Sequence, residues 1–268
     1  MTIRDTFEML KPKDEMALIA YQTAGYPDLE TSINNIRLLA DSGADIIELG
    51  VPFSDPIADG PTIQVSSQAA LEKGVTLAQI IEAVSKIECG VPLVAMSYLN
   101  PLMAYGKQRL FRDMKEAGFS GVIIPDLPME EAVRRRTETG ERKKEETGTW
   151  AEAAETNEID MIFLVTPTTT EERLKKLAKA SRGFIYCVSL TGITGERTEL
   201  PPHLSEFVGK VKAHSDTPAA VGFGISTPEH VAQLKGIADG VIVGSRIVKA
   251  ITSSEDVGSL VRSLKDAC

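Results

Sequence analysis

Residues 45–62 read Asp45-Ile-Ile-Glu48-Leu-Gly-Val-Pro-Phe-Ser-Asp55-Pro-Ile-Ala-Asp59-Gly-Pro-Thr62, an apolar run followed by a loop rich in proline, glycine and carboxylates. The apolar run is typical of a buried strand. A carboxylate inside such a strand must be paired, solvated at a cavity or neutral, and this applies to Glu48. Asp59 lies in a loop that can fold back over the strand end, and two carboxylates in different surroundings can divide acid and base roles. The alternative is a structural ion pair for Glu48, with Asp55 and Asp59 serving only the turn.

The same unit, a short aliphatic strand followed by a helix, recurs along the chain. Strands that alternate with helices indicate a parallel sheet, and eight such units indicate a closed barrel. We therefore expect the α/β class and a single (β/α)8 TIM-barrel domain over residues 1–268, with extra helices at the N-terminus and in loops. The competitor is a doubly wound open sheet, but it rarely needs eight strands and no GxGxxG follows the first strand. The expected strands are 16–23, 45–49, 91–97, 121–124, 161–165, 184–189, 219–221 and 240–243.

Residues 134–149 break this rhythm. They contain no apolar side chain, six basic and four acidic side chains, and two glycines. Such a segment cannot bury enough surface to offset its ordering entropy. We expect a solvated polar insertion in the helix after the fourth strand, with the helix resuming at Trp150.

Composition excludes several function classes. A formal charge of −9 and a pI near 5.0 argue against non-specific nucleic-acid binding and against an anionic membrane surface. They leave an anionic metabolite open, because helix N-termini bind phosphate on acidic proteins. Three widely spaced cysteines without a CxxC pair, and no apolar run near about 18 residues, indicate a cytoplasmic protein.

Two kinds of catalytic site are also disfavoured. No lysine lies in an expected strand, which argues against a Schiff-base aldolase. The three histidines fall in loops or helices, and HxH and HExxH motifs are missing, so we expect no metal site and no histidine triad. Acid–base chemistry by carboxylates is what the sequence favours.

Active sites of this fold lie at the carboxyl ends of the strands. One set of residues expected there is apolar or aromatic and suits a flat ring, although a place in the barrel core is an equal alternative for each of them. Another set is rich in glycine, and its backbone N–H groups, next to helix N-termini, suit a phosphate. The ring set is Tyr21, Met96, Ile123, Leu164 and Phe223, and the phosphate set is Gly195, Gly224, Gly244 and Ser245.

At these residues the sequence resembles the alpha chain of tryptophan synthase. The run from Glu48 to Pro61 matches that family's acidic signature, and Gly192-Ile-Thr194-Gly195 matches its loop after the sixth strand. Gly222-Phe-Gly224-Ile-Ser and Gly244-Ser245 match its phosphate loops, which adds Gly222 to the phosphate set. The resemblance runs from near the N-terminus to about residue 250, apart from residues 134–149.

The resemblance implies a lyase that cleaves indole-3-glycerol phosphate to indole and glyceraldehyde 3-phosphate by a retro-aldol reaction. It implies that Glu48 protonates the indole C3 atom and that Asp59 accepts a hydrogen bond from the indole N–H group. It implies further that Tyr186 supports Glu48, and that Thr194 bonds to Asp59 when two loops close over the substrate.

The resemblance also implies a partner, the tryptophan synthase beta chain, in an alpha2-beta2 heterotetramer. Pyridoxal phosphate would belong to that partner, with no cofactor in this chain. Pro52, Asp55 and Asn100 match family positions at the interface. Three alternatives stay open: a free-standing indole-3-glycerol phosphate lyase, a catalytically silent docking subunit, and a sugar-phosphate isomerase, which leaves the apolar half of the mouth unexplained.

Overall fold

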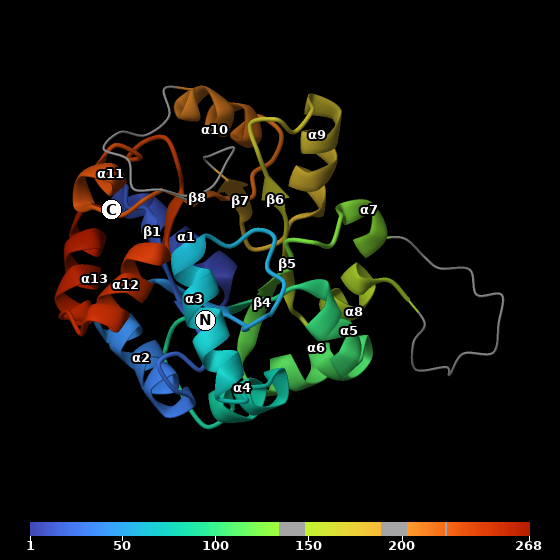
Figure 1. Cartoon of the computed structure of the whole chain (residues 1–268). Coiled ribbons are helices and arrows are strands. Elements are labelled where there is room, and N and C mark those ends of the chain that lie inside the picture. Colours follow the sequence, from blue (N-terminus) through green and yellow to red (C-terminus); the bar gives the residue numbers. More distant parts are fainter. Residues whose placement is uncertain (134–147, 189–202, 223) are drawn as a thin grey trace.

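The structure is a computed structural model that describes residues 1–133, 148–188, 203–222 and 224–268. Figure 1 shows a ring of helices around a central sheet. All strand pairs of this sheet are parallel. The strands are β1 (Ala17–Thr23), β2 (Ile46–Gly50), β3 (Leu93–Met96), β4 (Phe119–Ile123), β5 (Asp160–Ile162), β6 (Leu164–Val165), β7 (Ile185–Val188), β8 (Ala219–Gly222) and β9 (Gly240–Val243).

The strand order β5-β4-β3-β2-β1-β9-β8-β7-β6 confirms the predicted barrel. Its first and last members are the two halves of one expected strand, 161–165, so the sheet closes on itself. The break lies at Phe163, whose N–H group donates to the Ser181 hydroxyl at 3.1 Å instead of to a neighbouring strand. The Phe163 carbonyl still accepts from the Tyr186 N–H group at 3.0 Å, which keeps the second half in register with β7.

Helices follow the strands as expected, and their caps explain where they begin. Asp28 caps α2 by accepting from the Thr31 N–H group, and Gly74, at a φ of +73°, separates α3 from α4. The helices are α1 (Ile3–Leu10), α2 (Leu29–Asp41), α3 (Pro61–Glu72), α4 (Leu77–Val84), α5 (Leu99–Tyr105), α6 (Lys107–Glu116), α7 (Met129–Ala132), α8 (Trp150–Thr156), α9 (Glu171–Ala180), α10 (Leu204–Lys212), α11 (Pro228–Ala232), α12 (Ser245–Ser253) and α13 (Val257–Asp266), with a 3-10 turn, η1 (Lys11–Lys13).

The predicted polar insertion falls between α7 and α8, and most of it, residues 134–147, lies outside the described residues. That this segment is solvated, and that it interrupts a helix, stay predictions. Trp150 begins α8 as expected, and its ring packs edge-on against Phe111 at 6.0 Å between centroids. Across the described ranges, every helix is too short or too polar to cross a lipid bilayer.

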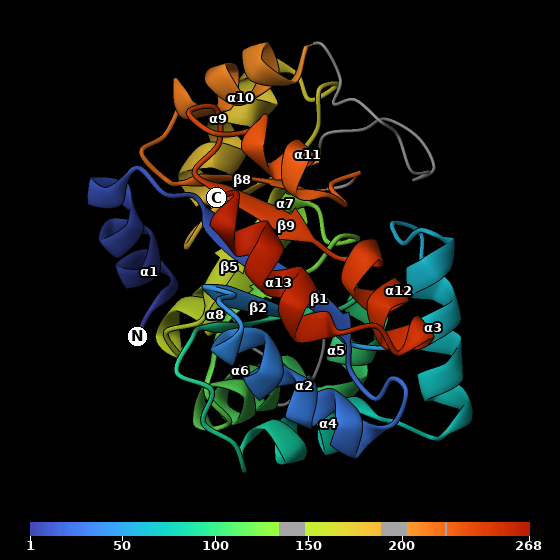
Figure 2. The ribbon, with the colours of Figure 1, turned by 90° about the vertical axis from the view of Figure 1, so that its left-hand side faces the viewer.

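The interior of the barrel is a separate apolar cluster, because alternate residues of each strand point inward. Helix α1 closes one end of it, and Figure 2 shows this helix on the side opposite to α3 and α12. Gly121 leaves room for the plug, since a Cβ atom there would lie 2.9 Å from Ile3 Cδ1. The cluster consists of Ile3, Phe7 and Leu10 of α1 with Ala17, Ile19, Ile46, Val94, Ile123, Ile162, Phe184, Tyr186, Ala220 and Ile242.

We expect the α1 plug to carry a measurable part of the stability. Ile3 is fully buried, so Ile3→Ala should lower the free energy of unfolding by about 2–5 kcal/mol through lost burial and the cavity left behind. Met9→Ala on the exposed face of the same helix is the matched control, with an expected change within about 0.5 kcal/mol. Urea unfolding measures both variants, and equal effects would contradict the plug.

Candidate active site

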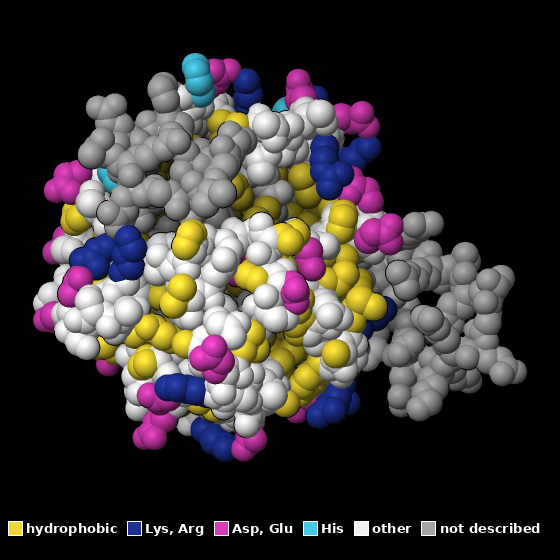
Figure 3. All heavy atoms as spheres, viewed as in Figure 1, with side chains coloured by type: hydrophobic (Ala, Val, Ile, Leu, Met, Phe, Trp, Pro, Cys, Tyr) yellow, Lys and Arg dark blue, Asp and Glu magenta, His cyan; other side chains and the backbone are white. Residues whose placement is uncertain are grey.

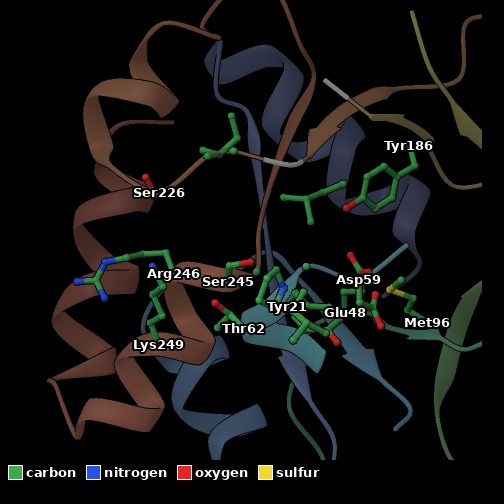
Figure 4. Close-up of a pocket in the computed structure, with 17 residues that line it drawn as sticks. Tyr21, Glu48, Asp59, Thr62, Met96, Tyr186, Ser226, Ser245, Arg246 and Lys249 are labelled. Carbon is green, nitrogen blue, oxygen red and sulfur yellow. The ribbon is translucent and has the colours of Figure 1, made fainter. Parts of the chain in front are cut away.

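The carboxyl ends of the strands open into a cavity of about 940 Å3, including its mouth (Figure 4). It lies at the barrel end opposite to α1, where this fold places its active sites. Eight of the predicted site residues line it: Tyr21, Glu48, Asp59, Met96, Tyr186, Gly224, Gly244 and Ser245.

Glu48 points into the barrel mouth from the middle of β2, with Tyr21 and Val94 beside it in the neighbouring strands. Only 1% of its surface is exposed. Within the described part of the chain, its Oε2 atom has no hydrogen-bond partner. Burial, and then the nearby charge of Asp59, raise the pKa of Glu48 to about 8. The carboxyl is therefore mostly protonated at neutral pH and can donate a proton.

Asp59 reaches the same end of the cavity from the loop between β2 and α3. Figure 4 shows its carboxyl group next to Glu48 and Met96. Burial raises the pKa of Asp59 to about 6, and a hydrogen bond with Tyr98 opposes this rise. Asp59 is therefore mostly ionised at neutral pH. One neutral and one charged carboxyl group side by side are suited to the division of acid and base roles, which is one of the two possibilities that the sequence leaves open.

Two tyrosines form the walls around the acid pair. Tyr21 and Tyr186 are 4% and 6% exposed, and burial raises the pKa of both hydroxyl groups. Two glycines make room for them, since a Cβ atom at Gly50 would lie 2.1 Å from the Tyr21 hydroxyl and one at Gly222 would lie 2.6 Å from the Tyr186 hydroxyl. Gly222 does not itself line the cavity. Its missing side chain serves the placement of Tyr186.

The opposite end of the cavity is polar. Helix α12 begins at Ser245 directly after Gly244, and its first N–H groups and its dipole favour an anion there. Figure 4 shows Arg246 and Lys249 at this end, and the Arg246 guanidinium pairs with Glu255 at 2.6 Å. Four polar residues that line the cavity were not predicted from the sequence: Thr62, Ser226, Arg246 and Lys249.

Part of the missed set carried a sequence signal. Ser245 and Lys249 are four residues apart, so they share one face of a helix that follows a predicted phosphate loop. That spacing places a cation beside the loop. Thr62 and Ser226 carried no comparable signal, because each depends on how a loop turns toward the cavity.

Other predicted residues lie elsewhere. Ile123 is fully buried in the barrel interior, and Leu164 packs against the same cluster, so the core interpretation fits both better than a ring contact. Thr194, Gly195 and Phe223 lie outside the described residues. Among the side chains that the structure describes, no group of three or more His, Cys, Asp or Glu residues is placed to hold a metal ion.

The predicted interface residues lie around the acidic loop. Asp55 and Asn100 are exposed, whereas Pro52 is buried. Large apolar side chains are exposed close to them in the chain, at Ile57 of the loop, Val65 of α3 and Met103 of α5. Figure 3 shows apolar side chains exposed across the face on which these elements lie, with charged side chains mostly toward its edge.

Comparison with known proteins agrees with this geometry. The family model of the tryptophan synthase alpha chain matches residues 7–266, which extends past the end of the resemblance at about residue 250. The alpha chain of Geobacter sulfurreducens is 44% identical, over 99% of this chain and 98% of its own. The alpha chain of Methanosarcina mazei is also 44% identical, over 98% of this chain and 91% of its own.

Solved structures give the same result. A chain in a structure of Mycobacterium tuberculosis tryptophan synthase superposes with a TM-score of 0.88 at 40% identity, covering 99% of this chain and 97% of that one. The alpha chain of Legionella pneumophila superposes with a TM-score of 0.84 at 33% identity, covering 100% and 97%. The chain described here belongs to the tryptophan synthase alpha chain family.

Proposed function

We propose that this protein cleaves indole-3-glycerol phosphate to indole and glyceraldehyde 3-phosphate, as the alpha subunit in tryptophan biosynthesis. The observation that carries the proposal is the pair of carboxyl groups at one end of a cavity whose other end suits an anion, with burial raising the pKa of Glu48 to about 8 and that of Asp59 to about 6. Family membership supports the alpha-subunit role. The chemistry follows from the acid pair.

The cavity matches the substrate from end to end. The bicyclic ring fits beside Met96 and the walls formed by Tyr21 and Tyr186, next to the acid pair. The phosphate fits at the start of α12, where N–H groups and nearby cations compensate its charge. The glycerol carbon that is bonded to the ring then lies between the two ends, close to Glu48.

The retro-aldol step needs a proton at one atom and the removal of a proton from another. Protonated Glu48 gives its proton to the indole C3 atom, and the ring becomes a cation. The resulting carboxylate takes the proton of the adjacent side-chain hydroxyl group. The oxygen then forms the aldehyde carbonyl, the carbon–carbon bond breaks, and its electron pair returns to the ring as indole. Glu48 ends protonated again, so no net proton is consumed.

Ionised Asp59 stabilises the cationic ring. It accepts a hydrogen bond from the indole N–H group, which becomes more acidic when C3 is protonated, so the interaction is stronger in the transition state than in the substrate. Tyr186 supports Glu48 from the side. Contacts of Thr194 with Asp59, of Gly195 and Gly222 with phosphate, and of Phe223 with the ring stay part of the proposal. In tryptophan synthase, pyridoxal phosphate belongs to the beta chain, and the steps above use only acid–base groups of this chain.

The proposal includes a beta-chain partner in an alpha2-beta2 assembly. Ile57, Val65 and Met103, which we call the apolar patch, are exposed on the acidic loop, α3 and α5, the segments that follow the carboxyl ends of β2 and β3. An apolar patch ringed by charges is typical of a docking surface and favours this assembly over a free-standing lyase. We also propose that the protein acts in the cytoplasm. We propose further that residues 134–149 form a polar insertion within a single domain.

We expect Glu48→Gln to abolish cleavage while the fold is retained. Glutamine keeps the shape of the side chain but cannot transfer the proton, so kcat/KM for indole-3-glycerol phosphate should fall by about 10²–10⁴-fold or more. Glu116→Gln, on the exposed surface of α6, is the control and should match the wild type. A Glu48→Gln variant with full activity would refute the acid–base assignment, and a wild type without activity would favour the silent docking subunit.

We expect Val65→Glu to weaken binding of a beta chain by about ten-fold or more, because it places a charge in the apolar patch. Leu38→Glu, an exposed apolar position of α2 outside the patch, should change the affinity little. Titration calorimetry with a purified beta chain gives both dissociation constants. Cleavage of indole-3-glycerol phosphate by each isolated variant should stay at the wild-type rate. Equal binding by the two variants would place the partner on another face.

A further inference from the structure

We propose that Tyr98 is a positioning residue that fixes the Asp59 carboxylate over the reacting ring. The inference deepens the proposed function and rests on it. It concerns a residue that does not itself line the cavity. Its effect on the reaction therefore passes through Asp59.

The Tyr98 hydroxyl group binds the acidic loop at Ala58, directly before Asp59. Its oxygen accepts a hydrogen bond from the Ala58 N–H group at 2.9 Å. Because the oxygen accepts there, its own hydrogen is left to donate, and the Asp59 carboxyl group, on the next residue of the loop, is the acceptor that we propose for it. One buried hydroxyl group thus holds the backbone directly before Asp59, at the point where the loop reaches the cavity.

The tyrosine ring is itself held in place. Tyr98 is 2% exposed and caps the N-terminus of α5 directly after β3. The Phe53 ring, from the start of the same loop, stacks on it at 5.1 Å between centroids and 28° between planes. The next residue, Leu99, donates its N–H group to the Asp126 carboxylate at 2.8 Å, which ties the helix start to the segment after β4.

Tyr98 gives the acidic loop a fixed point that the loop itself does not provide. Residues 51–60 contain no helix or strand, so the loop has no regular ladder of hydrogen bonds to fix Asp59. Tyr98 belongs to the rigid frame of the barrel, and functional groups keep their geometry best when such elements hold them. A displacement of about 1 Å in a positioned group can cost on the order of 100-fold in rate.

Tyr98 also acts on the charge of Asp59. The titratable groups that interact with this carboxyl group are Glu48 of β2, Tyr21 of β1, Tyr186 of β7 and Tyr98 at the start of α5. Burial raises the pKa of Asp59, and the Tyr98 hydrogen bond lowers it. Without the hydroxyl group, Asp59 should stay protonated to a higher pH and lose its ability to accept from the indole N–H group.

The test is Tyr98→Phe, which removes one oxygen atom and keeps the ring. The matched control is Tyr105→Phe at the other end of α5, where the hydroxyl group donates to Asp113 at 2.8 Å away from the cavity. We expect Tyr98→Phe to lower kcat/KM for indole-3-glycerol phosphate by about 10- to 100-fold, the usual effect of losing a hydrogen bond to a charged group. The acid limb of its pH profile should move to higher pH, and Tyr105→Phe should change neither quantity.

A second readout separates positioning from a general loss of packing. The dissociation constants of indole and 1-methylindole, measured by fluorescence titration, report whether an acceptor meets the ring N–H group. The wild type and Tyr105→Phe should bind indole more tightly than 1-methylindole. In Tyr98→Phe, the ratio of the two dissociation constants should approach one. A Tyr98→Phe variant that keeps the preference and the wild-type pH profile would overturn the inference.

The outcomes distinguish this inference from the proposed function. If the wild type cleaves the substrate and Glu48→Gln does not, a Tyr98→Phe variant that behaves like the wild type overturns only the role of Tyr98. If the wild type shows no cleavage, both fail. Should Tyr98→Phe not fold, amide hydrogen exchange of the wild type decides: the Ala58 amide should be protected, and exchange at the rate of an open loop would overturn the inference.

Discussion

The site depends on keeping one carboxyl group dry. Glu48 lies on the inner face of β2, and burial raises its pKa to about 8. The surroundings serve this condition: α1 closes the far end of the barrel, apolar side chains fill the interior, and tyrosine rings pack over glycines that have no Cβ atom to displace them. A cation or a second hydrogen bond beside Glu48 would favour the ionised form and remove the proton that the reaction needs. The fold thus leaves the Glu48 Oε2 atom without a hydrogen bond among the described residues, and the Glu48 carboxyl group can act as an acid at neutral pH.

The other functional parts are placed relative to that group. The acidic loop brings Asp59 to the same end of the cavity in a wetter setting, where it stays charged, and the Tyr98 hydroxyl ties this loop to the start of α5. Helix α12 provides the anion site at the opposite end. The same acidic loop exposes Ile57 on the outer surface. One short stretch therefore carries both carboxyl groups and part of the proposed docking face.

Patterns local in sequence were sufficient for the barrel, its strands, the start of α8 at Trp150 and the meeting of Glu48 and Asp59 at one cavity. Local patterns did not predict the features that depend on contacts between distant segments. The break at Phe163 arises from the Ser181 hydroxyl, eighteen residues away, and the α1 plug fits because Gly121 is small. Alternation along a strand shows which side chains point inward but not how deep they lie, so ring pocket and barrel core were equal alternatives for Ile123, which lies in the core. Gly222 is expected at the phosphate by motif, and the motif did not reveal that its missing side chain also makes room for the Tyr186 hydroxyl group.

The pH dependence of stability tests the dry carboxyl most directly. The pKa of Glu48 rises from an ordinary value of 4.5 to about 8 on folding, so between these values the folded state binds more protons than the unfolded state. Its contribution to stability is full below the unfolded pKa and is lost as pH rises through the folded pKa. Urea unfolding of the wild type and of Glu48→Gln from about pH 5 to pH 9 measures the difference. The account predicts that the wild type loses stability relative to the variant as pH rises, and parallel curves would contradict it.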